Sequence, residues 1–398
     1  MQTGWRIGTL FGIPLFLDPL WFFILALATV NFGFAYMQWG AVLAWSAGLT
    51  MALLLFSSVL LHELGHSLVA RLQGITVNSI TLFLFGGIAS IEEESKTPGQ
   101  AFQVAIAGPV VSIVLFLLLT LLSQSLPTDS PASVMMTDLA KINLVLALFN
   151  LIPGLPLDGG QVLKAAVWQL TGNRFQAVHW AARAGQALGW GAIALGLAVD
   201  FFTGELVSGL WIALLGWFGI RNASAYDRVT TLQEALLQIV AADAINHDFR
   251  VVDADQTLRQ FADLYLLETA APQVYFAASD GRYRGMVSVD DLRLVERSQW
   301  ESQTLHNILH PITTIPTVDE STPLAEVINQ LEAQQLPRIT ALSPAGAVTG
   351  VIDRGDIVQA LSGKLNLPFS EAEIKRIKED GSYPPGLQLQ AIAKAAKL

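Results

Sequence analysis

Residues 49–72 read LTMALLLFSSVLLHELGHSLVARL, an apolar run that carries His62, Glu63 and His66 near its end. It exceeds the ~20 mainly apolar residues that a transmembrane helix needs. On a helix, residues i and i+4 lie on one face, so the two imidazoles can hold one metal ion, and neutral imidazole suits Zn²⁺. Glu63 lies beside them, placed to take a proton from a water molecule at the metal. Ionisable side chains are costly in a membrane unless they have a function, so the segment predicts a membrane helix with a site for one zinc ion rather than a structural polar network.

The third ligand is expected from residues 150–160, which read NLIPGLPLDGG. A catalytic zinc has three protein ligands and one open position. Two prolines and three glycines break the helix in this segment, and broken backbone at membrane depth is tolerated only where it lines protein or a water-filled cavity. Asp158 is the only carboxylate in the break, which makes it the candidate ligand. The alternative is a loop aspartate at the cytosolic rim that caps a helix starting at Gln161.

The composition divides the 398 residues into an apolar part and an acidic part. Hydrophobic residues make up 52% of the chain, charged residues only 14%, and the mean hydropathy is +0.48, which excludes an ordinary soluble protein. Residues 1–222 carry eight Lys and Arg against ten Asp and Glu, whereas residues 223–398 carry fifteen against twenty-three. The acidic part has no basic stripe, so we expect no nucleic-acid partner. The absence of cysteine excludes disulfides and a thiol nucleophile.

Six membrane helices are expected in the apolar part. A capping residue followed by proline favours a helix start at Asp18 and again at Thr97. The fourth helix is interrupted after Asn150 by the Pro- and Gly-rich break. The six segments, with approximate boundaries, are 19–36, 41–72, 97–122, 138–150, 183–199 and 206–220.

The positive charges of the apolar part predict its orientation. Lys and Arg are absent from the loops between helices one and two, three and four, and five and six. Under the positive-inside rule this places both termini in the cytosol. We therefore expect a multi-pass protein of the plasma membrane, or of a bacterial or organellar thylakoid membrane, with the lipid bilayer as its surroundings. The charges at the other ends are Arg6, Arg71, Lys96, Arg174, Arg183 and Arg221.

A membrane-associated β-hairpin is expected between the second and third helices, in residues 76–94 (TVNSITLFLFGGIASIEEE). Two β-prone runs flank Gly86-Gly87, which is a turn signal. The hairpin either dips into the membrane face or lies on the cytosolic surface, and the sequence leaves both alternatives open. Residues 6–17 (RIGTLFGIPLFL) can add another strand.

The acidic part contains an internal repeat of about 65 residues, in segments 243–295 and 304–361. Each copy has an extended piece, a helix (258–267 or 324–334), a strand, a turn with glycine, and a strand that enters a helix. A repeated supersecondary unit usually packs on its copy, which predicts one soluble α/β domain. The aligned positions are Gly285 with Gly350 and Asp291 with Asp356.

The chain after the repeat is expected to be a tail. Ser370 and Glu373 have the spacing of a capping box that opens a short helix. The last residues, LQLQAIAKAAKL, can form a weakly amphipathic helix. We expect a frayed end, and the alternative is a role at the membrane surface or in autoregulation. The expected domains are therefore a membrane domain (1–222), a soluble domain (223–362) and a tail (363–398).

Residues 5–222 resemble the site-2 protease family of intramembrane metalloproteases, peptidase family M50, through HELGH and NLIPGLPLDGG. The resemblance implies that His62, His66 and Asp158 bind zinc and that Glu63 is the catalytic base. Asn150 matches the asparagine of the family's Asn-Pro…Asp-Gly motif, which implies that it positions the substrate or the oxyanion. Two further elements resemble the family: Gly86-Gly87, in a hairpin near the active site, and Gly108-Pro109, which we expect to serve helix packing.

The repeats resemble a pair of cystathionine-β-synthase (CBS) domains, which implies binding of ATP, ADP or AMP in clefts between the copies. Gly285, Ser288 and Asp291 fit the family's Gly-x-x-Ser/Thr-x-x-Asp pattern, whose hydroxyl and carboxylate meet the ribose. In the second copy Asp353 replaces the Ser/Thr beside Asp356, and an extra carboxylate would repel phosphates. The alternative is a purely structural repeat; such a pair can also join two chains into a homo-oligomer.

Together the two resemblances imply a site-2 protease of the subgroup that lacks a PDZ domain and carries a C-terminal regulatory module. Its expected activity is zinc-dependent proteolysis of the transmembrane segments of single-pass membrane proteins, modulated by an adenine nucleotide. The alternative is a CBS-regulated metal transporter or channel, because a buried His/Asp cluster is also a suitable transport site. Glu63 argues against this alternative, since a transport site needs no base beside two histidines.

Overall fold

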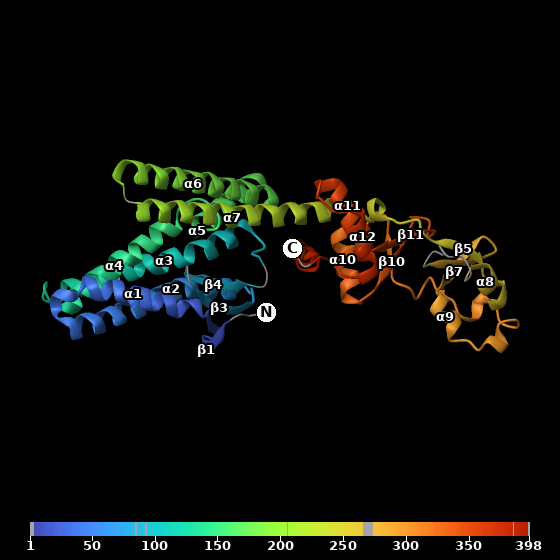
Figure 1. Cartoon of the computed structure of the whole chain (residues 1–398), viewed down its shortest axis with the longest axis horizontal. Helices are drawn as coiled ribbons and strands as arrows, with labels where there is room; N and C mark the ends of the chain where they lie inside the picture. The colour runs from blue at the N-terminus through green and yellow to red at the C-terminus, as the bar shows by residue number, and fades with distance from the viewer. Residues whose placement is uncertain are drawn as a thin grey trace. The chain divides into compact units, whose positions relative to one another are not determined.

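The computed structural model describes residues 4–83, 86–91, 94–204, 206–265, 274–384 and 386–396 (Figure 1). Its internal contacts divide the chain into two compact units, Met1–Thr230 and Thr231–Lys397. The division falls inside helix α7 (Leu206–Gln238), where the sequence predicted a boundary after residue 222.

Long apolar helices form the first unit. Among the described residues, five helices are long and apolar enough to cross a membrane. Helix α1 (Leu20–Ala35) is apolar but shorter. Each of the six segments expected to be a membrane helix is helical. The five long helices are α2 (Ala41–Leu72), α3 (Pro98–Gln124), α4 (Pro131–Asn150), α6 (Arg174–Thr203) and α7.

Helices α4, α6 and α7 are longer than the sequence predicted, for local reasons. Ser130 caps α4 by accepting a hydrogen bond from the Ser133 backbone amide, and proline follows as the first helical residue. Asn173 caps α6 in the same way, so this helix begins nine residues before the expected 183. Residues 221–238 contain neither glycine nor proline, so nothing ends α7 at residue 220.

A four-stranded sheet packs on the C-terminal half of α2. Ile13 and Ile80 of the sheet share a buried cluster with Leu64 of α2. The strand order is β1-β2-β3-β4, with β2 and β3 parallel and the other pairs antiparallel. The extra strand expected from residues 6–17 is thus confirmed, as two strands. The strands are β1 (Trp5–Leu10), β2 (Ile13–Leu17), β3 (Val77–Phe83) and β4 (Gly86–Ile91).

The predicted turn at Gly86-Gly87 is wrong. Both glycines belong to β4, where Gly86 pairs with Phe83 and Gly87 with Leu82. Residues 84 and 85, between the strands, lie outside the described residues. The reason for glycine at 87 is a close approach to α2, because a Cβ there would lie 3.0 Å from Glu63 Cδ.

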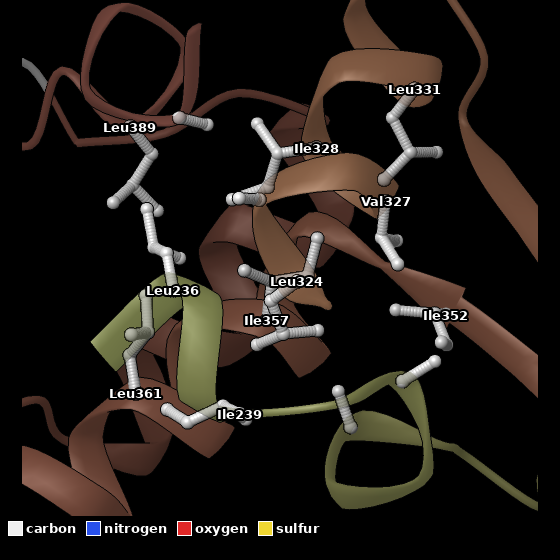
Figure 2. Packing of buried hydrophobic residues seen from close by; sticks show 14 of the residues in the cluster. Leu236, Ile239, Leu324, Val327, Ile328, Leu331, Ile352, Ile357, Leu361 and Leu389 are labelled. Carbon is white, nitrogen blue, oxygen red and sulfur yellow. The ribbon is translucent and has the colours of Figure 1, made fainter. Parts of the chain in front are cut away.

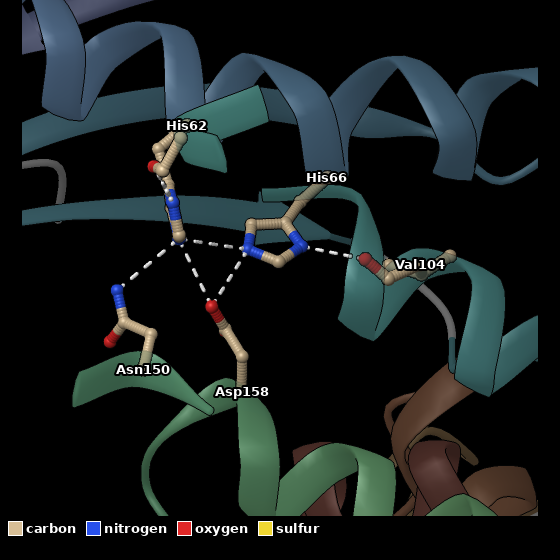
Figure 3. A network of polar contacts seen from close by, with 6 residues as sticks. His62, His66, Val104, Asn150 and Asp158 are labelled. Carbon is tan, nitrogen blue, oxygen red and sulfur yellow. Dashed lines mark hydrogen bonds and ion pairs between the residues drawn. The ribbon is translucent and has the colours of Figure 1, made fainter. Parts of the chain in front are cut away.

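The break after Asn150 leads into helix α5 (Asp158–Thr171), which begins three residues before the alternative start at Gln161. Asp158 is its first residue. The break therefore turns the chain so that the start of a new helix, rather than a loop, carries this carboxylate (Figure 3).

The second unit contains the two predicted copies, each built in the same order of elements. Their sheets have the orders β5-β6-β7-β8 and β11-β10-β9. The first copy comprises β5 (Arg250–Asp253), α8 (Leu258–Tyr265), β6 (Tyr275–Ser279), β7 (Arg282–Val287) and α9 (Val289–Arg293), and β8 (His310–Pro311), from the start of the second predicted segment, joins its sheet beside β7. The second comprises β9 (Thr317–Asp319), α10 (Leu324–Ala333), β10 (Arg338–Leu342), β11 (Val348–Asp353) and α11 (Arg354–Leu365). The end of the first expected helix, residues 266 and 267, lies outside the described residues.

The tail is not a frayed end. Helix α12 (Glu371–Asp380) starts at the capping box predicted at Ser370, and α13 (Leu389–Ala396) follows it. Leu389 is fully buried in one cluster with Ile328 of α10 and Leu236 of α7 (Figure 2). The amphipathic pattern of the last residues therefore supplies part of the core of the second copy. Short 3-10 helices lie at Met37–Trp39, Ala241–Ala244, Arg297–Gln299 and Leu305–Asn307.

We expect Leu389→Ala to destabilise the second unit by about 2–5 kcal/mol, because it removes buried methyl groups and leaves a cavity. Hydrogen exchange of the full chain, read by mass spectrometry over residues 231–396, would measure this as faster exchange in α10 and α13. The matched control is Leu294→Ala, since Leu294 is 85% exposed. Equal exchange in both variants would show that the tail does not pack in solution.

Candidate metal centre

The structure brings His62, His66 and Asp158 together (Figure 3). Asp158 Oδ2 lies 3.0 Å from His62 Nε2 and 3.3 Å from His66 Nε2. One ligand atom from each residue lies within 4.8 Å of the other two, close enough for all three to hold one metal ion. Asn150, the last residue of α4, places its Nδ2 3.4 Å from His62 Nε2. Segments predicted from separate motifs therefore converge on one point.

The surroundings of these atoms fit a zinc ion. Two imidazole nitrogens and one carboxylate oxygen are a zinc donor set. Both histidines are buried, at 3% and 8% exposed. Gly108 of α3 faces them: a Cβ there would lie 2.6 Å from His62 Nε2 and closer still to His66 Nε2. The packing role expected for Gly108 is therefore more specific: the absence of a side chain leaves room for the donor atoms of both histidines.

Helix α3 also orients both imidazoles, which the sequence did not reveal. His66 Nδ1 lies 2.6 Å from the carbonyl oxygen of Val104, and a carbonyl can only accept, so Nδ1 donates to it and Nε2 is the ring nitrogen that faces Asp158 and His62. His62 Nδ1 lies 2.9 Å from Oγ of Ser112, which is fully buried. Ser112 lies one helical turn after Gly108, so one face of α3 supplies both the space and the hydrogen-bond partner. A hydroxyl in an apolar helix was the only sequence signal.

We expect Ser112→Ala to weaken zinc binding by about 10–100-fold, as loss of a hydrogen bond that orients a ligand histidine does. Competition between the purified protein and a chromophoric zinc chelator would measure this without relying on activity. The control is Ser123→Ala in the same helix, where the hydroxyl bonds only the Thr120 carbonyl. Similar zinc affinity in both variants would remove Ser112 from the site.

Strand β4 lies over Glu63. Glu63 is partly buried on α2, between the two histidines in sequence, and Gly87 leaves no side chain between it and the strand. The predicted base therefore lies on the same helix as the two histidines and next to the outer strand of the sheet.

An ion pair joins the segment after β4 to the helix that carries Asp158. Glu94 Oε2 lies 3.0 Å from Lys164 Nζ of α5 and 3.7 Å from Arg174 Nη1 of α6. Lys164 is buried, at 8% exposed. Burial disfavours the charged form of Glu94, but the two cations outweigh it and hold its pKa below the ordinary value. The pair therefore contributes to holding α5 in place at neutral pH.

The residues predicted to bind nucleotide in the first copy also meet. Ser288 and Asp291 form a capping box at the start of α9, and His310 Nε2 lies 2.9 Å from Asp291 Oδ1. Burial opposes ionisation of Asp291, but the hydrogen bonds from His310 and Ser288 outweigh it, so its pKa lies below the ordinary value. Gly285 lies against the His310 backbone, where a Cβ would collide.

In the second copy, Asp353 takes the capping role of Ser288. Its Oδ1 accepts from the Asp356 backbone amide at 2.9 Å, at the start of α11. A carboxylate at a helix N-terminus is favourable in itself. The departure at Asp353 therefore preserves the local fold of the copy.

Comparisons with known proteins match both units. The family profile of Peptidase family M50 matches residues 50–133 and 127–191, and that of the CBS domain matches residues 240–297 and 307–363. A protein of Synechocystis sp. (strain ATCC 27184 / PCC 6803 / Kazusa), sll0528, is 42% identical over 365 residues, 91% of this chain and 96% of that protein; its name makes it a candidate zinc metalloprotease.

Two further similar proteins carry related names. Rip3 of Mycobacterium tuberculosis, also named as a candidate zinc metalloprotease, is 35% identical over 346 residues, 86% of this chain and 87% of that protein. A solved site-2 protease from Methanocaldococcus jannaschii is 27% identical, with a TM-score of 0.41, and covers 56% of this chain and 95% of that one.

Both sll0528 and Rip3 are named as metalloproteases, and this chain aligns with most of the length of each. They therefore give no support to the transporter alternative. The three clustered donor residues lie within the segments that the Peptidase family M50 profile matches. The CBS profile matches the region of the two repeats. The chain thus belongs to peptidase family M50, as a multi-pass zinc metalloprotease of the site-2 type with a C-terminal pair of CBS domains.

Proposed function

We propose that this protease cuts the transmembrane segments of single-pass membrane proteins. The observation that carries the proposal is the position of the donor cluster: two of its residues lie on α2, an apolar helix long enough to cross a membrane. A protease that acts on soluble chains has no need to place its metal site there, because charged and polar groups are costly in the bilayer.

In this proposal His62, His66 and Asp158 hold the zinc ion, which when bound supplies Lewis-acid polarisation of a carbonyl and a lower pKa for water. Glu63 takes a proton from the attacking water and delivers it to the leaving nitrogen as the C–N bond breaks. The Asn150 amide, whose Nδ2 lies 3.4 Å from His62 Nε2, donates a hydrogen bond to the carbonyl oxygen of the substrate in this proposal.

Strand β4 offers a place for an unwound substrate. A substrate helix hides its carbonyl groups in hydrogen bonds between residues i and i−4, so it must open locally before attack. β4 is the last strand in the sheet order and lies over Glu63. An extended substrate segment that adds to this edge would be held open beside the base.

Six membrane passages fit the helices better than five. Helix α1 has 16 residues, and with the flanking Pro19 and Tyr36 the apolar segment is within the range of about 17–25 residues that a span needs. An even number keeps both termini on the same side, and the positive charges make that side the cytosol. His66 then lies six residues from the cytosolic end of α2, within reach of water. The hairpin of β3 and β4 lies at the same membrane face.

The CBS pair is the proposed regulator. An adenine nucleotide bound to residues 240–363 would change cleavage only if it has different affinities for two states of the enzyme. Its ligand groups in the first copy are Ser288 and Asp291, and Asp291 is held by the side chains of Ser288 and His310. Pairing of two CBS modules would also make a homo-oligomer.

Purified full-length protein in detergent tests the proposed activity. The substrate is a single-pass protein with a different fluorophore at each end, and the control is the two soluble parts joined by a flexible linker instead of the membrane segment. We expect cleavage of the first only, its loss with a zinc chelator and its return on adding zinc. Two results would overturn the proposed substrate class: cleavage of the control alone, or failure of the zinc-loaded enzyme to cut any single-pass protein.

A further inference from the structure

In both CBS copies one oxygen atom of the final aspartate accepts the same backbone hydrogen bond. Asp291 Oδ2 accepts from the Ser288 backbone amide at 2.8 Å, and Asp356 Oδ2 accepts from the Asp353 amide at 3.0 Å. Each Oδ2 thus closes a capping box at the start of a helix. The other oxygen, Oδ1, remains to bind something else, so its partner distinguishes the copies.

In the first copy the partner of Oδ1 is an exposed side chain. His310 donates to Asp291 Oδ1 at 2.9 Å, and its side chain is 54% exposed. In the second copy the partner comes from the tail: Lys378 Nζ of α12 lies 2.5 Å from Asp356 Oδ1. Asn246 adds a longer bond of 3.4 Å to the same oxygen, and the Asp356 side chain is only 6% exposed.

Helix α12 also covers the start of α11, where a ligand of Asp356 would have to sit. A Cβ on Gly355 would lie 3.1 Å from the Ile374 carbonyl oxygen and 3.0 Å from Lys378 Cε. The corresponding position in the first copy is Asp290, whose side chain is 84% exposed. The same turn of the two copies is therefore covered by the tail in one and open to solvent in the other.

Two further contacts hold the tail after α12, so its position does not depend on Lys378 alone. Beyond α12, the Tyr383 ring lies 5.9 Å from the Arg354 guanidinium of α11. The carbonyl of Ala393 in α13 accepts from Asn329 of α10 at 3.3 Å. These contacts keep a positive charge beside two carboxylates, Asp353 and Asp356, that would otherwise repel each other and any phosphate.

We propose that helix α12 is the resident occupant of the second CBS copy, with the Lys378 ammonium in the place of a ligand on Asp356. The module then has one nucleotide site per chain instead of two, and that site uses Asp291. The stoichiometry rests on the proposed binding of adenine nucleotide, whereas the seating of the tail does not. The tail therefore determines how many nucleotides each chain of the protease can bind.

Equilibrium dialysis of the full chain against radiolabelled ATP and AMP tests the stoichiometry. We expect one nucleotide per chain, a loss of affinity of about tenfold or more in Asp291→Ala, and unchanged binding in Asp356→Ala. Asp356→Asn, which keeps an oxygen for the capping box, serves as the second variant if the alanine variant unfolds. Two nucleotides per chain, or weaker binding on changing Asp356 but not Asp291, would refute the proposal.

A cross-link decides the seating of the tail even if no nucleotide binds, which would count against the proposed regulation alone. The chain has no cysteine, so Gly355→Cys with Lys378→Cys introduces its only thiols. The second change shortens the Lys378 side chain and so removes its Cε, which a Cβ at 355 would approach to 3.0 Å. We expect a disulfide between them in most molecules under mild oxidation, and little with Gly363→Cys and Lys378→Cys, since Gly363 has open space around it. Equal yields for the two pairs would show that α12 is not seated on α11.

Discussion

Glu63→Gln is expected to lower the cleavage rate by about 10²–10⁴-fold, the usual contribution of a positioned general base. The amide has nearly the shape of the carboxylate but cannot take a proton from water. The substituted side chain would still lie under β4, so the fold and the donor cluster should be unchanged. Rates at saturating substrate, together with the zinc content of the purified variant, would measure this effect.

The matched control for this prediction is Asp138→Asn. Asp138 is a carboxylate of another apolar helix, α4, and lies twelve residues before Asn150; its partners are the Tyr36 hydroxyl at 3.1 Å and the Lys141 ammonium at 3.5 Å. We expect this variant to cut at nearly the normal rate. If Glu63→Gln cuts as fast as Asp138→Asn, Glu63 is not the base. If it loses zinc as well as activity, its role is structural.

Gly108→Ala is expected to abolish activity and to weaken zinc binding by about 100-fold or more, a larger effect than the loss of an outer hydrogen bond. The added Cβ would occupy the space between the Nε2 atoms of His62 and His66. α2 and α3 would have to separate, or the imidazoles to turn away, for the two to coexist. Chelator competition and zinc analysis of the purified variant would detect the loss without an activity assay.

Gly99→Ala in the same helix provides the comparison. Both changes replace a glycine of α3 by a residue of higher helix propensity, but a Cβ on Gly99 meets nothing within 4 Å. We expect Gly99→Ala to keep both zinc and activity. A Gly108→Ala variant that binds zinc normally would mean that α3 does not approach the donor atoms as closely as the structure places it.

The helices that the sequence predicted most directly are those whose signals are local. The apolar run before Leu72, the cap at Thr97 and the break after Asn150 each act within a few residues, and each element has the predicted type. Boundaries were less accurate where a signal was weak, as at the caps Ser130 and Asn173. The predicted turn at Gly86-Gly87 failed because glycine serves tight turns and close approaches alike, and only the position of α2 distinguishes them.

The tail is a second case in which a local pattern is compatible with two structures. The amphipathic pattern ending at Ala396 is short, and a short amphipathic segment fits a frayed end as well as a packed helix. What decides between them is whether an apolar surface lies within reach. Here α10 presents one, and Leu389 is buried against it.

By itself, the sequence determined the class of this protein: long apolar segments, two histidines one helical turn apart with a glutamate between them, an aspartate in a broken helix, and a repeated α/β unit. These properties depend on spacing within one segment, so a single chain displays them. The sequence also made Asp158 the expected partner of the two histidines, but only the tertiary structure brought it to 3.0 Å from His62 Nε2, set α3 against both imidazoles and placed Lys378 on Asp356. Contacts between distant segments have no fixed spacing in the sequence, because packing of the whole unit, and not local preference, brings their atoms together.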